Sequence, residues 1–142
     1  MPTTLVALDD SEGAARALDW AIAHAAADES FVLVTVLPAA RAGQGYPPPH
    51  QSERHAAEEM LQKAADSATS KAGTSPSIKT EVLEGSATGE ILDAAKRHGA
   101  DHIVVGARGS GGFPRMLIGS VSSAVVHHAE SPVTVIPAGA RV

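Results

Sequence analysis

The chain has 142 residues and a mass of 14.4 kDa, which is the size of one globular domain. It contains no cysteine, and this excludes disulfides, thiolate metal sites and a cysteine nucleophile. The net charge of -5 and the aromatic content of 3% argue against a nucleic-acid partner, which needs basic side chains or stacking rings. We expect a single domain over residues 1–142.

The first residues do not resemble a targeting signal. Residues 1–4 lack a basic segment, and the apolar run that follows them is too short for a signal peptide. No run of 18 apolar residues occurs, so we expect no membrane-spanning helix. A cytoplasmic location is the simplest expectation.

Short apolar runs, bounded by Asp, Gly, Pro or Ser, predict five strands. They cover residues 5–8, 31–37, 78–83, 102–105 and 133–136. Three of the runs lack polar alternation, as strands that are buried on both faces do. Residues 78–82 do alternate apolar and polar side chains, which predicts an edge strand or a strand with one face in contact with water.

Four segments with apolar residues at helical spacing separate the strands, over residues 11–27, 52–72, 88–98 and 120–129. Asp10 or Ser11 can cap the first of them, and Gly73 and Gly99 follow the second and the third. In the last segment one face carries Val121, Ala124, Val125 and His128. The alternation predicts a doubly wound α/β fold, a parallel sheet with helices on both faces.

Residues 39–51 (AARAGQGYPPPHQ) interrupt this pattern. The segment contains two glycines and three consecutive prolines, which exclude a helix or a central strand. We interpret it as a flexible surface loop between the second strand and the second helix. A linker between two domains is the alternative, but neither half would then have enough elements to fold alone.

Residues 104–121 combine the end of a strand, a glycine-rich loop and the start of a helix. Glycines let backbone N–H groups approach a ligand, and a helix N-terminus adds unpaired donors and partial positive charge. Arg108 and Arg115 add cations that could meet phosphate oxygens. The pattern indicates a phosphate site; a glycine-rich surface loop before a capped helix is the alternative.

Two common phosphate motifs are absent, since the chain has no GxxxxGK[ST] and no GxGxxG after its first strand. Asp9 follows the first strand, and ligands of doubly wound sheets bind at the carboxyl ends of strands where the strand order reverses. If the first and fourth strands are neighbours, Asp9 and the loop after Gly106 border one crevice. There the carboxylate can accept hydrogen bonds from a base or a ribose, whereas for Asp10 and Ser11 we favour helix capping.

The glycines also fit a known signature. Gly106-x2-Gly109-x9-Gly119-Ser120 matches the G-x2-G-x9-G-[ST] pattern of the ATP-binding universal stress proteins, and the chain resembles this family over its length except for residues 39–51. The resemblance implies a Rossmann-like five-stranded sheet in the order 3-2-1-4-5. It also implies that ATP, or ADP or AMP, binds across the junction of strands 1 and 4, with any Mg²⁺ or Mn²⁺ bound through the phosphates.

The resemblance implies ligand contacts at matching positions. Around the base it places Ala7, Leu8, Asp9 and Val36. Along the ribose and phosphates it places Val105, Gly106, Arg108 and Gly109, and at the phosphate tail Gly119, Ser120 and Val121.

The last strand predicts a homodimer. Val133, Thr134, Val135 and Ile136 form an uncharged edge that can pair with its own copy under two-fold symmetry, and the proteins that the chain resembles dimerise there. The alternative is a monomer in which residues 138–142 cover the edge.

No nucleophile–base pair is visible, so we expect a nucleotide-dependent stress-response or signalling module without dedicated catalysis. A slow ATP hydrolase using the same crevice is the alternative. A phosphotransfer receiver domain shares the architecture, but Glu84-Gly85 and Pro137-Ala138 stand where it requires an acceptor Asp and a Lys.

Overall fold

The structure is a computed structural model of the chain that describes residues 2–38, 51–107, 119–137 and 139–141. Strands and helices alternate along these residues, as the sequence predicts. The order is β1 (Thr3–Ala7), α1 (Glu12–Ala23), β2 (Ser30–Leu37), α2 (Gln51–Ala72), β3 (Ile78–Glu84), α3 (Ala87–Arg97), β4 (His102–Gly106), α4 (Ser120–His128) and β5 (Val133–Ile136).

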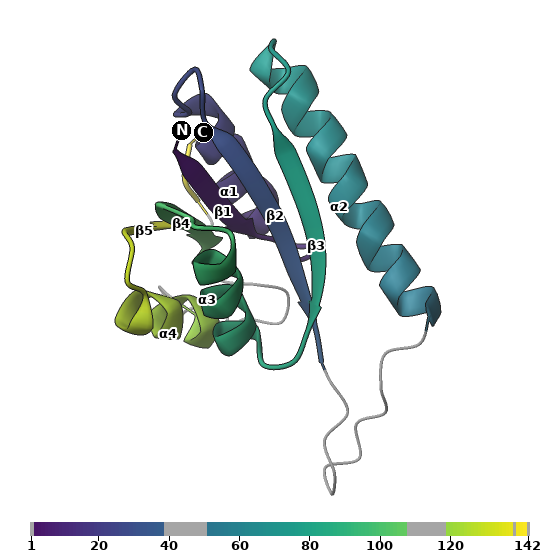
Figure 1. Ribbon diagram of the computed structural model, residues 1–142, viewed down its shortest axis with the longest axis vertical. Coiled ribbons are helices and arrows are strands. Elements are labelled where there is room, and N and C mark those ends of the chain that lie inside the picture. The colour runs from purple at the N-terminus through teal and green to yellow at the C-terminus, as the bar shows by residue number, and fades with distance from the viewer. Residues whose placement is uncertain (1, 39–50, 108–118, 138, 142) are drawn as a thin grey trace, which may run out of the picture.

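The five strands form one parallel sheet in the order β3-β2-β1-β4-β5, which confirms the predicted order (Figure 1). Val6 lies between Leu33 of β2 and Val104 of β4 in the register. The strand order reverses at β1, because β2 and β3 follow on one side and β4 and β5 on the other. The carboxyl ends of β1 and β4 are therefore the place where a doubly wound sheet binds its ligands.

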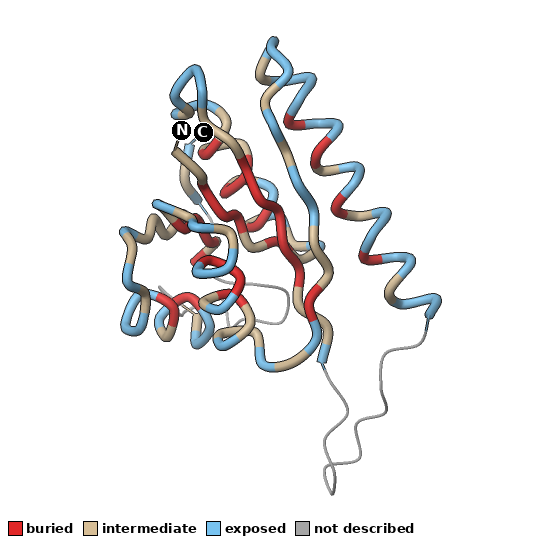
Figure 2. The backbone as a smooth tube through the Cα atoms, in the orientation of Figure 1, coloured by how far each residue is buried: buried red, intermediate tan, exposed pale blue. Residues whose placement is uncertain are grey.

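Helices cover both faces of this sheet. On one face α1 and α2 pack against a cluster that includes Val6, Leu33 and Val104. On the other face α3 and α4 pack against Leu5 and Ile103. These residues precede Val6 and Val104 in the sequence and lie on the opposite face because side chains alternate along a strand. The buried residues follow the strands and the inner sides of the helices, as Figure 2 shows.

Several element ends differ from the sequence-based prediction. The first strand covers Thr3–Ala7 and not residues 5–8, although the Leu8 N–H still donates to Val34 O. Gln51, assigned to the loop 39–51, is the first residue of α2, and residues 39–50 lie outside the described residues. None of the helices in the described parts is both long and apolar enough to cross a membrane.

The first helix ends four residues earlier than predicted, at Ala23 and not at Ala27. A run of alanines favours helix, but the Ala25 N–H donates to Ile22 O and the Glu29 carboxylate accepts the Ala26 N–H at 2.9 Å. These local bonds satisfy the backbone in a turn that leads into β2. Gly73 and Gly99 follow their helices at φ +67° and +62°, as expected for glycines at helix ends.

The buried face of α4 also differs from the prediction. Val125 is buried as expected, but Val121 and His128 are exposed and Ser122 is buried instead. The Ser122 hydroxyl donates to Ala107 O at 2.9 Å, so this polar side chain is satisfied inside the protein.

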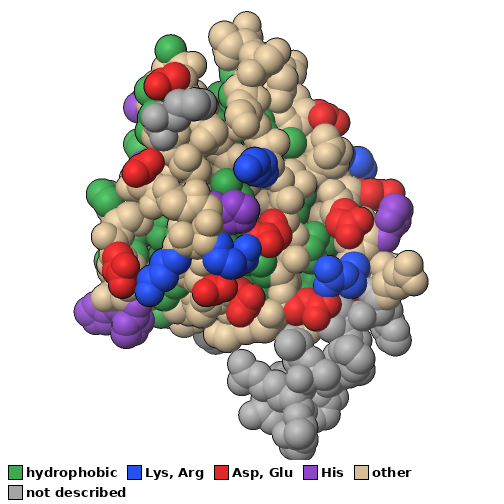
Figure 3. All heavy atoms as spheres, viewed as in Figure 1, with side chains coloured by type: hydrophobic (Ala, Val, Ile, Leu, Met, Phe, Trp, Pro, Cys, Tyr) green, Lys and Arg blue, Asp and Glu red, His purple; other side chains and the backbone are tan. Residues whose placement is uncertain are grey.

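Glu81 connects the edge strand β3 to the end of α3. Both terminal nitrogens of Arg97 donate to its carboxylate at 3.2 Å, and His98 Nε2 lies 3.0 Å from Oε1. Acidic and basic side chains are interspersed on this face of the molecule (Figure 3). Partial burial acts to raise the pKa of Glu81, but the hydrogen bonds from His98 and Arg97 together outweigh it and lower the pKa below its ordinary 4.5.

The lowered pKa predicts how stability depends on pH. The Glu81 carboxylate stabilises the fold above pH 4.5, and this contribution is lost as the pH falls through the lower pKa of the folded state. Glu81→Gln should therefore lower the melting temperature at pH 7 and flatten its fall between pH 6 and pH 3. Thermal unfolding over this pH range measures both effects. Glu59→Gln, which removes an exposed carboxylate of α2 that lies 3.0 Å from His55 Nε2, is the control. Curves for Glu81→Gln that run parallel to the parent would contradict the assignment.

Candidate functional site

A cavity of 430 Å³ opens at the carboxyl ends of the strands, at the junction where the strand order reverses. Its volume lies in the range of pockets that hold small ligands. Its walls come from the ends of β1, β2 and β4 and from the first turns of α1, α3 and α4.

Nine of the eleven predicted ligand contacts line this one cavity, and the other two, Arg108 and Gly109, lie outside the described residues. The nine are Ala7, Leu8, Asp9, Val36, Val105, Gly106, Gly119, Ser120 and Val121. The structure therefore brings together residues that are up to 114 positions apart in sequence, from Ala7 to Val121.

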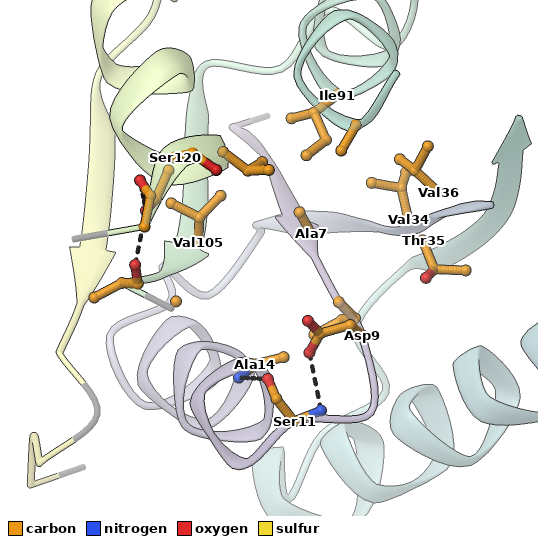
Figure 4. Close-up of a pocket in the computed structure, with 17 residues that line it drawn as sticks. Ala7, Asp9, Ser11, Ala14, Val34, Thr35, Val36, Ile91, Val105 and Ser120 are labelled. Carbon is orange, nitrogen blue, oxygen red and sulfur yellow. Dashed lines mark hydrogen bonds between the residues drawn. The ribbon is translucent and has the colours of Figure 1, made fainter. Parts of the chain in front are cut away.

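One side of the cavity is apolar. The side chains of Ala7, Val34, Val36, Ile91 and Val105 point toward a common space in Figure 4, from three strands and from α3. Apolar walls around a confined volume suit a flat, weakly hydrated group such as a nucleobase.

Asp9 and the start of α1 form a polar side of the cavity. Asp9 Oδ1 accepts the Ser11 N–H at 2.9 Å, and the Ser11 hydroxyl accepts the Ala14 N–H at 3.2 Å (Figure 4). Of the two predicted caps of α1, Ser11 is therefore the N-cap, whereas Asp10 is exposed. The first bond orients the Asp9 carboxylate, which is the one charged group among the described residues of the lining.

The N-terminus of α4 forms the remaining wall. Its N-cap is Gly119, which has no side chain to cap the helix, and the first bond of the helical ladder is Ser123 N–H to Gly119 O. The N–H groups of Ser120 and Val121 therefore have no partner within the helix. Together with the positive end of the helix dipole they form a wall that favours an anion.

Gly106 has a packing role that the sequence did not reveal. A Cβ atom at this position would lie 3.1 Å from both the carbonyl carbon and the oxygen of Gly13. The absence of a side chain thus lets the first turn of α1 approach the end of β4. We predicted Gly106 as a ligand contact, and its position also fixes how closely two walls of the cavity meet.

The lining also contains residues that sequence reasoning missed, namely Ser11, Ala14, Val34, Thr35, Ala87, Ile91, Ala107 and Ser122. Val34 could have been found, because it lies on the same face of its strand as Val36. Ser122 could not, because the pattern of α4 indicated another buried face. Within the described ranges, no three or more His, Asp or Glu side chains are grouped as a metal site would require.

A doubly wound parallel sheet with a ligand-sized cavity at its switch point defines a class of α/β small-molecule-binding domains. Comparison with known families makes the assignment specific. The model of the universal stress protein family matches residues 1–137. The chain belongs to the universal stress protein family.

Two curated relatives illustrate the match. Universal stress protein YxiE of Bacillus subtilis is 32% identical over 144 residues, which cover 93% of this chain and 96% of YxiE. Universal stress protein Rv2623 of Mycobacterium tuberculosis is 31% identical over 146 residues, which cover 93% of this chain and 46% of Rv2623. The chain spans less than half the length of several curated relatives, between 28% and 46%.

Solved structures share the fold over nearly the whole chain. UspA from Lactobacillus plantarum has a TM-score of 0.76 at 27% identity, covering 95% of this chain and 97% of that one. The universal stress protein from Archaeoglobus fulgidus in complex with dAMP has a TM-score of 0.73 at 26% identity, covering 96% and 97%. A universal stress protein in complex with cAMP has a TM-score of 0.71 at 25% identity, covering 97% and 98%.

The close approach at Gly106 predicts the effect of adding one methyl group. Gly106→Ala should destabilise the protein by about 1–3 kcal/mol, the usual cost of overpacking, because the backbone of Gly13 must move. Chemical denaturation measures the loss. Gly139→Ala is the matched control, since a Cβ atom there meets nothing within 4 Å. Equal stability of Gly106→Ala and the parent would show that the two backbones are not in contact.

Proposed function

We propose that the chain binds an adenine nucleotide (ATP, ADP or AMP) in the cavity between β1 and β4 and acts as a nucleotide-dependent module in stress response or signalling. The observation that carries the proposal is the convergence of the nine described contact residues on one cavity of ligand size. The family assignment and the complexes of similar proteins with dAMP and cAMP support it.

The backbone of β2 supports a defined contact to the base. In a parallel sheet the N–H and C=O of one residue point to the same neighbouring strand, and this direction alternates along the chain. The Ser30 N–H donates to Pro2 O, and Val34 O accepts the Leu8 N–H, so the even-numbered residues of β2 face β1. The backbone groups of Val36 point the same way.

β1 does not extend far enough to pair with Val36, because its last ladder pair is Ala7 with Val34. The N–H and C=O of Val36 therefore point into the space beyond the end of β1, where the cavity lies. A donor beside an acceptor matches adenine, whose N1 accepts and whose N6 amino group donates. Guanine presents the opposite pattern on this edge, since its N1–H donates and its O6 accepts.

The charges of the cavity support one orientation of the nucleotide. Phosphates are favoured at the N-terminus of α4, beside the N–H groups of Ser120 and Val121. The Asp9 carboxylate would repel phosphates, so it suits a hydrogen-bond donor of the ribose or the base. A Mg²⁺ or Mn²⁺ ion would enter with the nucleotide, because such ions are bound mainly by phosphates plus one or two carboxylates.

Calorimetric titration tests the proposal. The parent should bind AMP and ATP, and it should bind GMP at least about tenfold more weakly, because the backbone of Val36 cannot match the guanine edge. Asp9→Ala should weaken AMP binding, whereas Asp10→Ala, at the exposed neighbouring position, should leave it unchanged. No binding of AMP or ATP at millimolar concentration would contradict the proposed function.

We also propose that β5 forms the homodimer contact. Among the residues that the structure describes, β5 pairs only with β4 and is the edge of the sheet; its Val133 and Val135 are partly exposed. An uncharged apolar edge strand has unpaired N–H and C=O groups that can bond to another strand. With two-fold symmetry this pairing gives a dimer and does not extend further.

Val135→Lys should convert the dimer to a monomer, because two lysines would meet across the symmetric edge. Light scattering measures the mass, and AMP binding should be retained. Thr80→Lys, on the exposed opposite edge strand β3, should leave the dimer intact. A parent protein that is monomeric at micromolar concentration would overturn this proposal.

A further inference from the structure

Ser122 is a polar side chain that is 4% exposed, in the first turn of α4. Its hydroxyl lies 2.9 Å from Ala107 O and 3.2 Å from Gly119 O. A hydroxyl has one proton to donate, and the shorter distance assigns that proton to Ala107 O. The hydroxyl thus reaches out of its own helix to the residue that follows β4.

Ala107 receives a second bond from the start of α4. Its carbonyl accepts both the Gly119 N–H and the Ser122 hydroxyl, and its own N–H donates to Ile136 O of β5 at 2.8 Å. Ala107 is 2% exposed, so these bonds are shielded from water. Both lone pairs of one buried carbonyl are therefore used to hold the N-terminus of α4 on the end of β4.

The two bonds have different geometric consequences. The bond from Gly119 holds the chain at a single point, just before the helix begins. The bond from Ser122 lies three residues further on, so the two together fix a direction. Val125 is buried one turn later and packs against the sheet, which fixes the rest of the helix. Without the hydroxyl, the first turn could rotate about the Gly119 bond.

We infer that Ser122 is a positioning residue, which aims the N–H groups of Ser120 and Val121 at the phosphate end of the bound nucleotide. This inference rests on the proposed function. Although Ser122 borders the cavity, its hydroxyl acts through the direction of the helix, because its proton is donated to Ala107 O and not toward the ligand. Removing it therefore weakens the contacts to phosphate and leaves the apolar side of the cavity, formed by residues such as Val34 and Ile91, unchanged.

The experiment compares adenosine with AMP and ATP, by calorimetric titration of the full chain. Ser122→Ala should weaken AMP and ATP by about tenfold, equivalent to about 1.4 kcal/mol, and adenosine by less than about twofold. Ser123→Ala, at the exposed next position of the same helix, is the matched control and should bind all three like the parent. Ser122→Thr keeps the hydroxyl and should restore the preference for AMP over adenosine.

A purely structural role of Ser122 would give another pattern. It would lower the melting temperature and weaken adenosine and AMP in equal proportion, and that result would overturn the inference, as would unchanged binding of AMP. If Ser122→Ala does not fold, the ratio of the affinities for AMP and adenosine is measured for Ser122→Cys instead, since a thiol is a weak donor of similar size. A parent that binds neither adenosine nor AMP would contradict the proposed function itself.

Discussion

The chain leaves β1 toward one face of the sheet and β4 toward the other, and the cavity depends on this divergence. α1 follows β1 and packs with α2 on one face, whereas α4 follows β4 and packs with α3 on the opposite face. Because the two strands are neighbours, the described residues that follow them border a common space beyond their ends. Any parallel sheet whose strand order reverses has such a gap. What is particular to this chain is the chemistry that its sequence places around the gap.

That chemistry depends on close backbone contacts. The glycine at position 106 lets the first turn of α1 approach β4, and the carbonyl of Ala107 holds the first turn of α4. Two helix N-termini thus meet at the end of one strand. The Asp9 carboxylate, oriented by the Ser11 N–H, adds negative charge on the α1 side, so of these two helix N-termini that of α4 favours an anion. The cavity therefore has an apolar part, a hydrogen-bonding part and an anion-binding part, which correspond to the base, the ribose and the phosphates of the proposed nucleotide.

Much of this was predictable from local sequence rules. Period-two and continuous apolar runs gave the five strands, and Ser11, Gly73 and Gly99 marked helix ends because capping and left-handed turns favour those residue types. The strand order and the identity of most residues of the lining came from the signature glycines, through resemblance to a family. Helical periodicity alone did not predict that Ser122 would be buried. Its hydroxyl is satisfied there by Ala107 O, which lies 15 residues away in the sequence. The close approach of Gly13 to Gly106 and the direction of the Val36 backbone likewise follow from tertiary packing and strand register, which no local pattern encodes.

The central claim is that an adenine nucleotide occupies the cavity between β1 and β4, with its base beside Val36 and its phosphates at the N-terminus of α4. Titration of ¹⁵N-labelled protein with AMP, followed by amide chemical shifts, tests it most directly. The account predicts saturable shifts at Val36, Ser120 and Val121, while Gln62 and Lys79, which are exposed on α2 and β3, stay unchanged. Saturable shifts confined to α2 and β3, or none at millimolar AMP, would contradict it.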